Sequence, residues 1–185
     1  GINIDMTPVK SGERYFYVWS HRKNIGTPLD TGSMLMIAEF DPVHPERLIS
    51  EPKCLSRPLY GFENTEHTIN NEGPYAFYYH NKIYLAYSGG DARGYLYAIG
   101  MLTANDGDDL CDLSVWEKAK TPIASFATIP GEYGPGHNSF FWDRDQNLWI
   151  AYHAVTSFEE KIVSSGMRRV YFEQDKTPRF DVIVE

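Results

Sequence analysis

Short runs of aromatic and β-branched residues alternate along this chain with clusters of Gly, Pro, Asn and Asp. This alternation is typical of many short antiparallel strands joined by turns, and stretches with a helical period are scarce. The pattern therefore predicts an all-β protein. The clearest strand-length runs cover residues 15–20, 34–40, 75–79, 83–88, 95–102, 139–142, 148–152 and 170–173.

Three segments share one pattern, in which a polar site is followed by a strand, a short turn and a second strand with alternating aromatics. The segments read IDMTPVKSGERYFYVWS, NEGPYAFYYHNKIYLAYS and GHNSFFWDRDQNLWIAYH. They recur about every 65 residues, somewhat more than the roughly 40 to 50 residues of common propeller repeats. We therefore expect a single partial β-propeller domain with repeats at about residues 1–65, 66–130 and 131–185.

Each repeat carries one polar residue at almost the same distance before the last aromatic of its segment. These residues are Asp5, Glu72 and His137, and we interpret their positions as equivalent. Because the innermost strands of a propeller line a central channel, the three side chains are expected to converge in one pocket. A lone carboxylate before a strand is usually a cap or turn residue, but agreement between three repeats weakens that alternative.

Two carboxylates in an aromatic-lined pocket suit acid–base hydrolysis of a glycosidic bond, in which one is protonated and the other ionised. Glu72 is the better candidate for the acid. Its neighbours Asn71, Gly73 and Pro74 are uncharged, and a nearby Asp5 carboxylate would further favour the protonated form.

His137 has three interpretations at this level. It is a core histidine held by hydrogen bonds, a direct metal ligand, or a residue oriented toward a hydrated ion on the propeller axis. No second His or Cys lies at zinc-like spacing, which argues against a catalytic zinc. The first of the three interpretations is the commonest for a histidine, and a hard, oxygen-liganded cation with bound waters, such as calcium, stays open as the alternative. No organic cofactor is expected.

The charge of the chain excludes some partners. Its 185 residues carry a formal net charge of −8 at pH 7, which opposes binding to nucleic acid or anionic membranes because both need a basic patch. No apolar run approaches the ~20 residues needed to cross a bilayer, so a soluble protein is expected, whether cytoplasmic or secreted. Cys54 and Cys111 lie far apart without a zinc-site spacing and do not decide the compartment.

Four segments occur in an order and spacing that resemble glycoside hydrolase family 43: IDMTPV, INNEGPYAFYYHNKIYLAYSGG, YAIGMLTANDGDDLCDLSVWEK and YGPGHNSFFWDRDQNLWIAYHA. The chain is most similar to the α-L-arabinofuranosidase, arabinan-acting and β-xylosidase-like members. The resemblance implies a five-bladed β-propeller, of which this chain supplies the third to fifth blades. It also implies inverting hydrolysis of arabinose- or xylose-containing plant carbohydrates, with α-L-arabinofuranosidase activity ranked before β-xylosidase activity.

The resemblance assigns a role to each polar residue of the repeats. Glu72 in NEGP corresponds to the general acid, Asp5 in IDMTPV to the aspartate that modulates and orients it, and His137 in GPGHN to the histidine near the central cation. The resemblance also gives weaker matches to residues that line the sugar pocket. For each of them, ordinary packing or a solvated surface charge is the alternative interpretation. These residues are Phe62, Glu63, Tyr75, Tyr133 and Arg169, with Arg168 as the alternative arginine.

The family's general base is an aspartate near the start of the first blade, and no residue here corresponds to it. Asp30, Asp41 and Asp91 lie in the wrong context to replace it. We therefore expect the isolated chain to be inactive or nearly so until N-terminal blades or another chain complete the propeller around the carbohydrate substrate. The alternative function is that of a non-catalytic carbohydrate-binding propeller.

Overall fold

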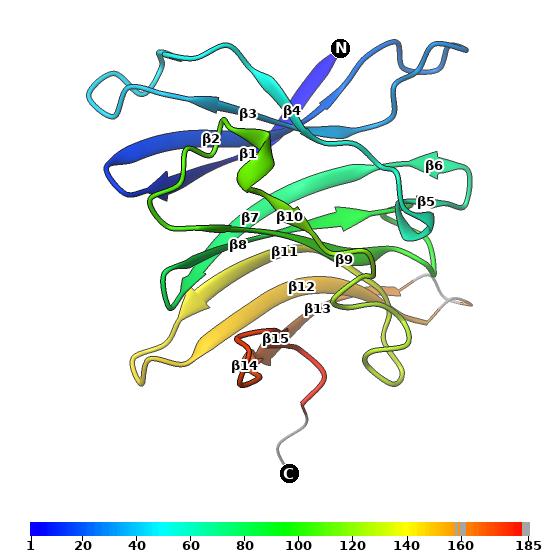
Figure 1. Ribbon diagram of the computed structural model, residues 1–185. Coiled ribbons are helices and arrows are strands. Elements are labelled where there is room, and N and C mark those ends of the chain that lie inside the picture. Colours follow the sequence, from blue (N-terminus) through cyan, green and yellow to red (C-terminus); the bar gives the residue numbers. More distant parts are fainter. Residues whose placement is uncertain (158, 160–161, 183–185) are drawn as a thin grey trace.

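The computed structural model describes residues 1–157, 159 and 162–182. Most of its strands form three antiparallel sheets that follow one another along the chain and stack (Figure 1). The first sheet contains β1 (Ile2–Ser11), β2 (Arg14–Arg22), β3 (Met34–Glu39) and β4 (Lys53–Ser56); the second contains β7 (Asn71–Tyr79), β8 (Lys82–Gly89), β9 (Ala98–Asn105) and β10 (Glu117–Lys118); the third contains β11 (Tyr133–Trp142), β12 (Leu148–Ser157) and β13 (Ile162–Arg169).

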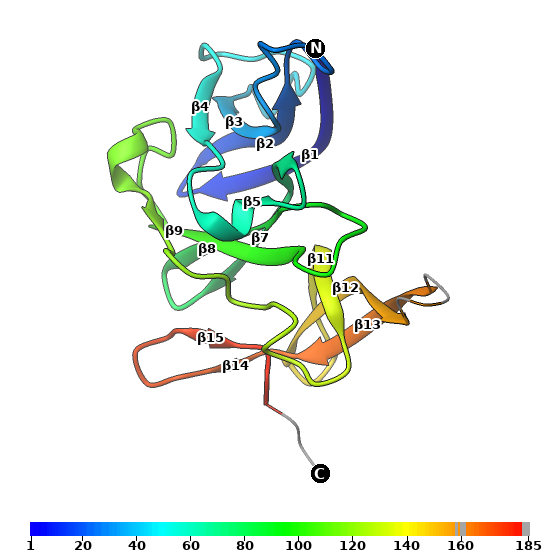
Figure 2. The same ribbon diagram turned by 90° about the vertical axis from the view of Figure 1, so that its right-hand side faces the viewer.

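The remaining elements are short. Two hairpins and two 3₁₀ turns connect or flank the sheets, and the turn η1 lies against β8 at one end of the second sheet (Figure 2). The all-β prediction is confirmed. The short elements are β5 (Asn64–Thr65), β6 (Thr68–Ile69), β14 (Tyr171–Phe172), β15 (Pro178–Arg179), η1 (Gly61–Glu63) and η2 (Leu113–Val115).

Tight turns set the register of the hairpins. His80 and Asn81 both have positive φ, 45° and 59°, between the paired residues Tyr79 and Lys82. Two consecutive residues of this kind form a type I′ turn, whose twist matches that of the strands it joins. The turn therefore fixes which residues of β7 and β8 face each other.

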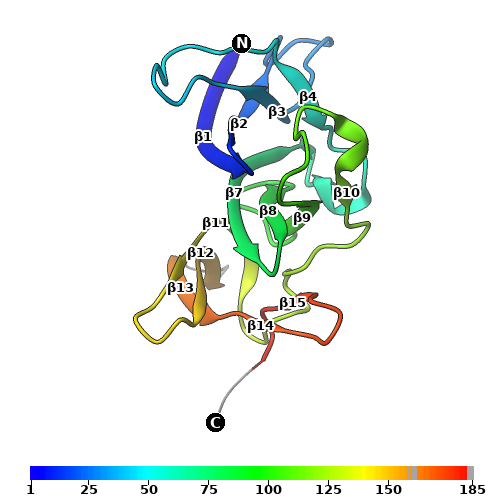
Figure 3. The same ribbon diagram turned by 60° about the vertical axis from the view of Figure 1, so that its left-hand side comes forward.

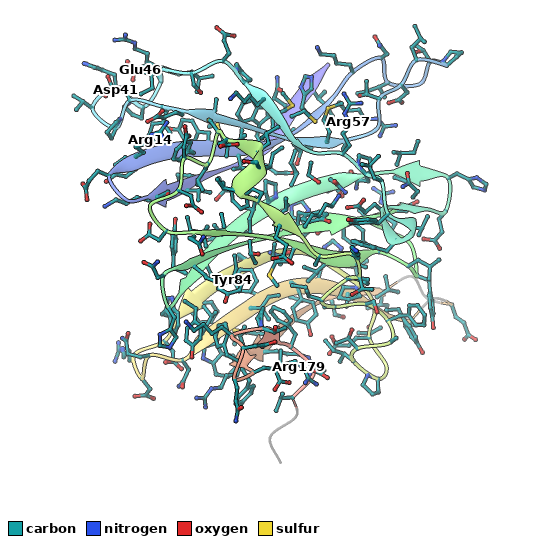
Figure 4. The ribbon with its side chains drawn as sticks, in the orientation of Figure 1. Arg14, Asp41, Glu46, Arg57, Tyr84 and Arg179 are labelled. Atoms are coloured by element: carbon teal, nitrogen blue, oxygen red, sulfur yellow. The ribbon has the colours of Figure 1, made fainter. Side chains whose placement is uncertain are left out.

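The core has two parts, one on each side of the second sheet. Val18 and Ile37 of the first sheet pack against Ile83 and Leu85 of β8. On the opposite face, Tyr84 packs among residues of the third sheet and lies between the two sheets in Figure 4. Every residue of β8 after Lys82 is buried, because both faces of this strand are covered.

The first strands of the three sheets, β1, β7 and β11, lie next to one another (Figure 3). Each is interrupted by a β-bulge opposite its partner strand. In each bulge one residue has left-handed backbone: Asp5 with φ 57°, Gly73 with φ 58° and His137 with φ 50°. A bulge redirects side chains, so this row of bulges is the natural position for a site.

Among the residues that the structure describes, no helix is long and apolar enough to span a membrane.

Candidate active site

The bulges bring Asp5 and His137 together beside the segment that carries Glu72. Oδ2 of Asp5 accepts hydrogen bonds from Oγ of Ser20 at 3.1 Å and from the backbone N–H of Gly73 at 3.3 Å. Oδ1 lies 3.8 Å from Nε2 of His137, and the two side chains are 20% and 49% exposed. Asp5 therefore fixes the peptide that follows Glu72 and still reaches the surface.

Glu72 is half-buried and accepts a hydrogen bond at Oε1 from the hydroxyl of Tyr97 at 2.8 Å. The tyrosine side chain is fully buried. Burial, followed by the charge of Glu72, raises the pKa of Tyr97 well above its usual range. The hydroxyl consequently stays protonated at physiological pH and orients the carboxyl group as a donor.

Two buried serines hold the bulges in place. The N–H of Gly73 donates to Oγ of Ser20 at 3.1 Å, and the N–H of His137 donates to Oγ of Ser88 at 2.7 Å. Each serine belongs to the sheet that precedes the bulge it binds. The sequence contained this signal, because the first two repeat segments end in the pairs Trp-Ser and Tyr-Ser.

The structure corrects the register predicted for the three polar residues. Asp5, His137 and Gly73 occupy the equivalent left-handed position, whereas Glu72 lies one residue earlier, opposite Ser88. Counting back from an aromatic residue cannot detect the extra residue that each bulge inserts. The side chain of Glu72 therefore leaves the chain in a different direction from those of Asp5 and His137.

A positively charged residue near Glu72 was missed by sequence reasoning. Arg22 at the end of β2 forms a bidentate pair with Asp30, with distances of 2.9 and 2.8 Å. This pair raises the pKa of Arg22, to which the charge of Glu72 also contributes, and lowers that of Asp30. Because Arg22 and the N–H groups of nearby glycines already bind Asp30, this aspartate has a structural role.

Asp41 and Asp91 are also turn residues. Oδ1 of Asp41 accepts the N–H of Val43, and Figure 4 shows Asp41 in the loop between β3 and β4. Oδ1 of Asp91 accepts the N–H of Arg93 in the same way. Both carboxylates therefore stabilise local turns.

Glu63, predicted to line a sugar pocket, lies in a buried network of hydrogen bonds, and its place in a pocket stays a prediction. Glu63 is completely buried. Its Oε1 lies 2.5 Å from Nζ of Lys118 and accepts the hydroxyl of Tyr87 at 2.6 Å, and its Oε2 accepts the N–H groups of Leu59 and Tyr60. These bonds give Glu63 a structural function.

Phe62, the neighbour of Glu63, is partly buried and packs against the core between the first and second sheets. Tyr75 is 37% exposed and borders Phe140. Tyr133 is half-buried and stacks on Tyr95, with ring centroids 4.7 Å apart.

The two neighbouring arginines of β13 have different surroundings. Arg168 binds Glu132 at 2.7 Å and Tyr152 at 2.9 Å. Arg169 is exposed and lies over the ring of Tyr171, 5.0 Å from its centroid. Arg169 is therefore the one with its guanidinium open to solvent, and its role in a sugar pocket stays a prediction.

A cavity of about 810 Å³ lies on the outer face of the first sheet and has Asp5 in its wall. Trp19 and His21, alternate residues of β2, share the wall with Asn3. Nε1 of Trp19 donates to Oδ1 of Asn3 at 3.0 Å. The wall therefore combines an aromatic side chain with polar groups held by a hydrogen bond.

The described residues do not by themselves complete a cation site. Asp5 and His137 supply two donors, but within the described part of the chain no group of three or more His, Cys, Asp or Glu residues could hold a metal ion. Calcium takes six to eight oxygen ligands. A hydrated cation here would depend on water and on further polypeptide, and the calcium site stays a prediction.

Comparison with known proteins places the chain in a known family. The profile of the family described as "Glycosyl hydrolases family 43" matches residues 2–178. The extracellular exo-alpha-(1->5)-L-arabinofuranosidase of Streptomyces avermitilis is 28% identical over 98% of this chain and 38% of that protein. Its counterpart from Streptomyces chartreusis is 34% identical over 77% of this chain and 42% of that protein.

Solved structures agree. The alpha-L-arabinofuranosidase from Lactobacillus brevis superposes with a TM-score of 0.83 and 28% identity, over 97% of this chain and 55% of that chain. The chain thus spans about half of this structure and less of the two Streptomyces proteins. The match of the family profile to nearly all of its residues shows that the chain belongs to glycosyl hydrolase family 43.

Proposed function

We propose that this chain supplies the general-acid part of an inverting, exo-acting α-L-arabinofuranosidase and forms the third to fifth blades of its five-bladed propeller. The observation that carries the proposal is the Glu72 carboxyl group, oriented by Tyr97 and placed beside a peptide that Asp5 binds. Family membership and the names of its relatives support the substrate class. β-Xylosides are the next candidate substrates.

In this mechanism Glu72 protonates the glycosidic oxygen as the bond from that oxygen to the anomeric carbon breaks. Tyr97 binds Oε1, so the transferred proton resides on Oε2. Water attacks the anomeric carbon from the opposite face and gives its proton to a second carboxylate, which in inverting enzymes lies roughly 6.5 to 9.5 Å from the acid. Asp5 and Ser20 hold the acid-bearing strand in place.

The water-activating base comes from further polypeptide in this proposal. The three aspartates that could be considered, Asp30, Asp41 and Asp91, all accept hydrogen bonds within local turns. Because the chain spans 38% of the Streptomyces avermitilis enzyme, ample sequence in such a relative remains to supply the base.

The test is Glu72→Gln in a protein that includes the complementary blades. Loss of general acid catalysis is expected to lower kcat about 10²- to 10⁴-fold on arabinosides with alkyl leaving groups. The loss should be far smaller on dinitrophenyl arabinoside, whose leaving group needs no proton. Glu13→Gln, at a side chain that is 97% exposed, is the control and should leave both rates unchanged. Equal rates for Glu72→Gln and the parent on both substrates would refute the assignment.

A second candidate function, carbohydrate binding without catalysis, is favoured by the lack of an evident base among the described carboxylates. Titration of the chain with arabinan, arabinoxylan and xylo-oligosaccharides distinguishes the two. Binding that is never followed by release of reducing sugar, even with the complementary blades present, would support the binding function.

A further inference from the structure

Tyr97 connects the second sheet with the third. It lies directly before β9, is completely buried, and donates its hydroxyl to Oε1 of Glu72 at 2.8 Å. Its ring contacts Gly136 of β11 and His153 of β12, which face each other as a pair in the third sheet. The tyrosine that binds the proposed acid is therefore held by residues of the following sheet.

Gly136 leaves the space in which the tyrosine ring lies. A Cβ atom at this position would be 2.0 Å from Cε1 and 2.4 Å from Cδ1 of Tyr97, far inside van der Waals contact. The φ angle of Gly136 is not positive, so the ring, and not the backbone conformation, is what excludes a side chain here. The ring thus lies directly on the backbone of β11.

His153 stacks on the same ring. The two centroids are 5.6 Å apart and the planes differ by 16°, within the range of favourable aromatic contacts. The imidazole is itself fixed, because a hydrogen bond connects it to the backbone of Ala92. Gly136 and His153 together therefore restrict how far the ring of Tyr97 can rotate or shift.

The position of this ring decides where the hydroxyl lies. A tyrosine side chain has two main torsions and a rigid ring, so a fixed ring also fixes the oxygen. A shift of about 1 Å would lengthen the bond to Glu72 beyond the normal hydrogen-bond range. Misplacement of a reacting group by about 1 Å can lower a rate about 10²-fold.

We infer that Gly136 and His153 are positioning residues for the general acid and that they act through the ring of Tyr97. This role rests on the proposed function of Glu72 as the acid. A change at either residue moves the hydroxyl of Tyr97 and so misplaces the carboxyl group that it binds. Protonation of the leaving group on the second sheet therefore depends on two residues of the third.

The test compares two substrates in a protein that includes the complementary blades. A methyl arabinoside needs the proton from Glu72, whereas a dinitrophenyl arabinoside does not. Gly136→Ala is expected to lower kcat about 10- to 100-fold on the methyl arabinoside and less than about threefold on the dinitrophenyl arabinoside. Loss of both rates by the same factor, or of neither, would overturn the inference.

Gly166→Ala is the matched control. A Cβ atom at Gly166 would lie 2.7 Å from Cζ of Tyr152, a buried tyrosine of the third sheet whose hydroxyl binds Glu132. This variant should suffer a similar steric clash and keep the ratio of the two kcat values found in the parent. A ratio that falls equally in Gly136→Ala and Gly166→Ala would reflect general loosening of the sheet and overturn the inference.

A double-mutant cycle shows whether Gly136 acts through the hydroxyl. Tyr97→Phe keeps the ring and removes the hydrogen bond to Glu72. In the Tyr97→Phe background, Gly136→Ala should lower kcat on the methyl arabinoside no further, because both changes interrupt the same contact. Independent losses that multiply would overturn the inference.

The His153 variants test the inference even where Gly136→Ala does not fold. His153→Phe keeps a ring that can stack on Tyr97 and should preserve the kcat ratio better than His153→Leu, with circular dichroism to verify folding. Equal ratios in both variants and the parent would overturn the role of His153. If Glu72→Gln lowers kcat on the methyl arabinoside and these variants do not, the positioning role alone is wrong. Unchanged rates in Glu72→Gln would refute the acid and the positioning role together.

Discussion

The left-handed backbone of Asp5 and His137 is the residue-scale feature on which the site depends. Both have φ between 50° and 57°, a conformation that costs a residue other than glycine about 1–3 kcal/mol when it is strained. The surrounding hydrogen bonds stabilise it: Ser88 accepts the N–H of His137, and Ser20 donates to the carboxylate of Asp5. The two serines therefore help to hold Asp5 and His137 in their bulges.

Ser88→Ala tests this role. The substitution leaves the N–H of His137 without its acceptor in a position where the serine is completely buried, so the free energy of unfolding should fall by about 1–3 kcal/mol. Urea denaturation measures the change. Ser164→Ala, at a hydroxyl that contacts Thr156 on the exposed part of β13, is the control and should change stability by less than ~0.5 kcal/mol. Equal effects of the two substitutions would contradict the proposed role.

Sequence reasoning identified the polar residues within the bulges and missed the residues of other strands that bind to the site. Asp5 and His137 were recognisable because each repeat carries one polar residue before a strand. Tyr97, the hydrogen-bond partner of Glu72, was missed, because this contact depends on two strands meeting in space. The environment of Glu63 was likewise hidden, since Lys118 approaches it from a distant strand.

At the scale of elements, a buried network ties η1, β7 and β10 together. Nζ of Lys118 lies 2.5 Å from Glu63, donates to the carbonyl of Arg57 at 2.8 Å and reaches Oδ1 of Asn71 at 3.4 Å. Burial lowers the pKa of Lys118, an effect that its bond to Glu63 opposes. Because Asn71 directly precedes Glu72, this network supports the strand that carries the proposed acid.

Lys118→Met should therefore be strongly destabilising. It leaves the completely buried carboxylate of Glu63 without its counter-charge, which costs about 3–5 kcal/mol. The double variant Glu63→Gln, Lys118→Met removes both charges and should recover part of the loss, as urea denaturation of all four proteins would show. If the double variant is less stable than Lys118→Met, the buried charge is not the cause.

The turn between β11 and β12 is organised by Asp143. Its carboxylate accepts the indole N–H of Trp149 at 2.8 Å and the backbone N–H of Asn147 at 2.8 Å. These bonds lower the pKa of Asp143 to about 2, with Trp149 as the largest cause. The folded state thus favours the ionised form, and the stabilisation is complete above the unfolded pKa near 4 and disappears as the pH falls to about 2.

The expected result is a pH-dependent difference between the parent and Asp143→Asn. The variant should be less stable at pH 5, and the difference should shrink as the pH is lowered toward 2, because the parent loses the ionised carboxylate. Urea denaturation at several pH values measures it. Asp145→Asn, at an exposed position of the same turn, should follow the parent throughout. A difference that stays constant with pH would contradict the assignment.

Strands with at least one face packed against another sheet were predictable from the sequence, whereas an exposed edge strand was not. The runs at 34–40 and 83–88 agree with β3 and β8 to within two residues. β13 escaped prediction because IVSSGMRR mixes small, polar and charged residues and none of them is buried. Its strand conformation comes from pairing with β12, which local sequence does not reveal.

At the scale of the whole molecule, the second sheet is the centre of stability. One core cluster joins it to the first sheet through Leu85 and Tyr87, and the other joins it to the third through Tyr84 and Ala86. All four residues lie on β8. Within the described residues neither outer sheet has such cover on its far side, so the buried apolar contacts are concentrated between the sheets.

This distribution predicts the order of hydrogen exchange. Amides of β8 should exchange only through global unfolding, whereas amides of β13, an edge strand with no buried residue, should exchange through local opening. A difference of about 2 kcal/mol in opening free energy, roughly a thirtyfold difference in rate, is expected. Exchange followed by mass spectrometry measures both strands in one sample, and β3, covered on one face, should lie between them.

Comparable protection of β13 and β8 would show that the third sheet unfolds only with the rest of the chain and would contradict this distribution. Addition of the complementary polypeptide distinguishes two causes of slow exchange, local cover of β13 and a gain in the stability of the whole chain. If the third sheet is a blade of the proposed propeller and a further blade covers its outer face, protection of β13 should rise on binding. β8, already limited by global unfolding, should gain only the stability that binding adds to the whole chain. A rise confined to β8 would place the new contact elsewhere.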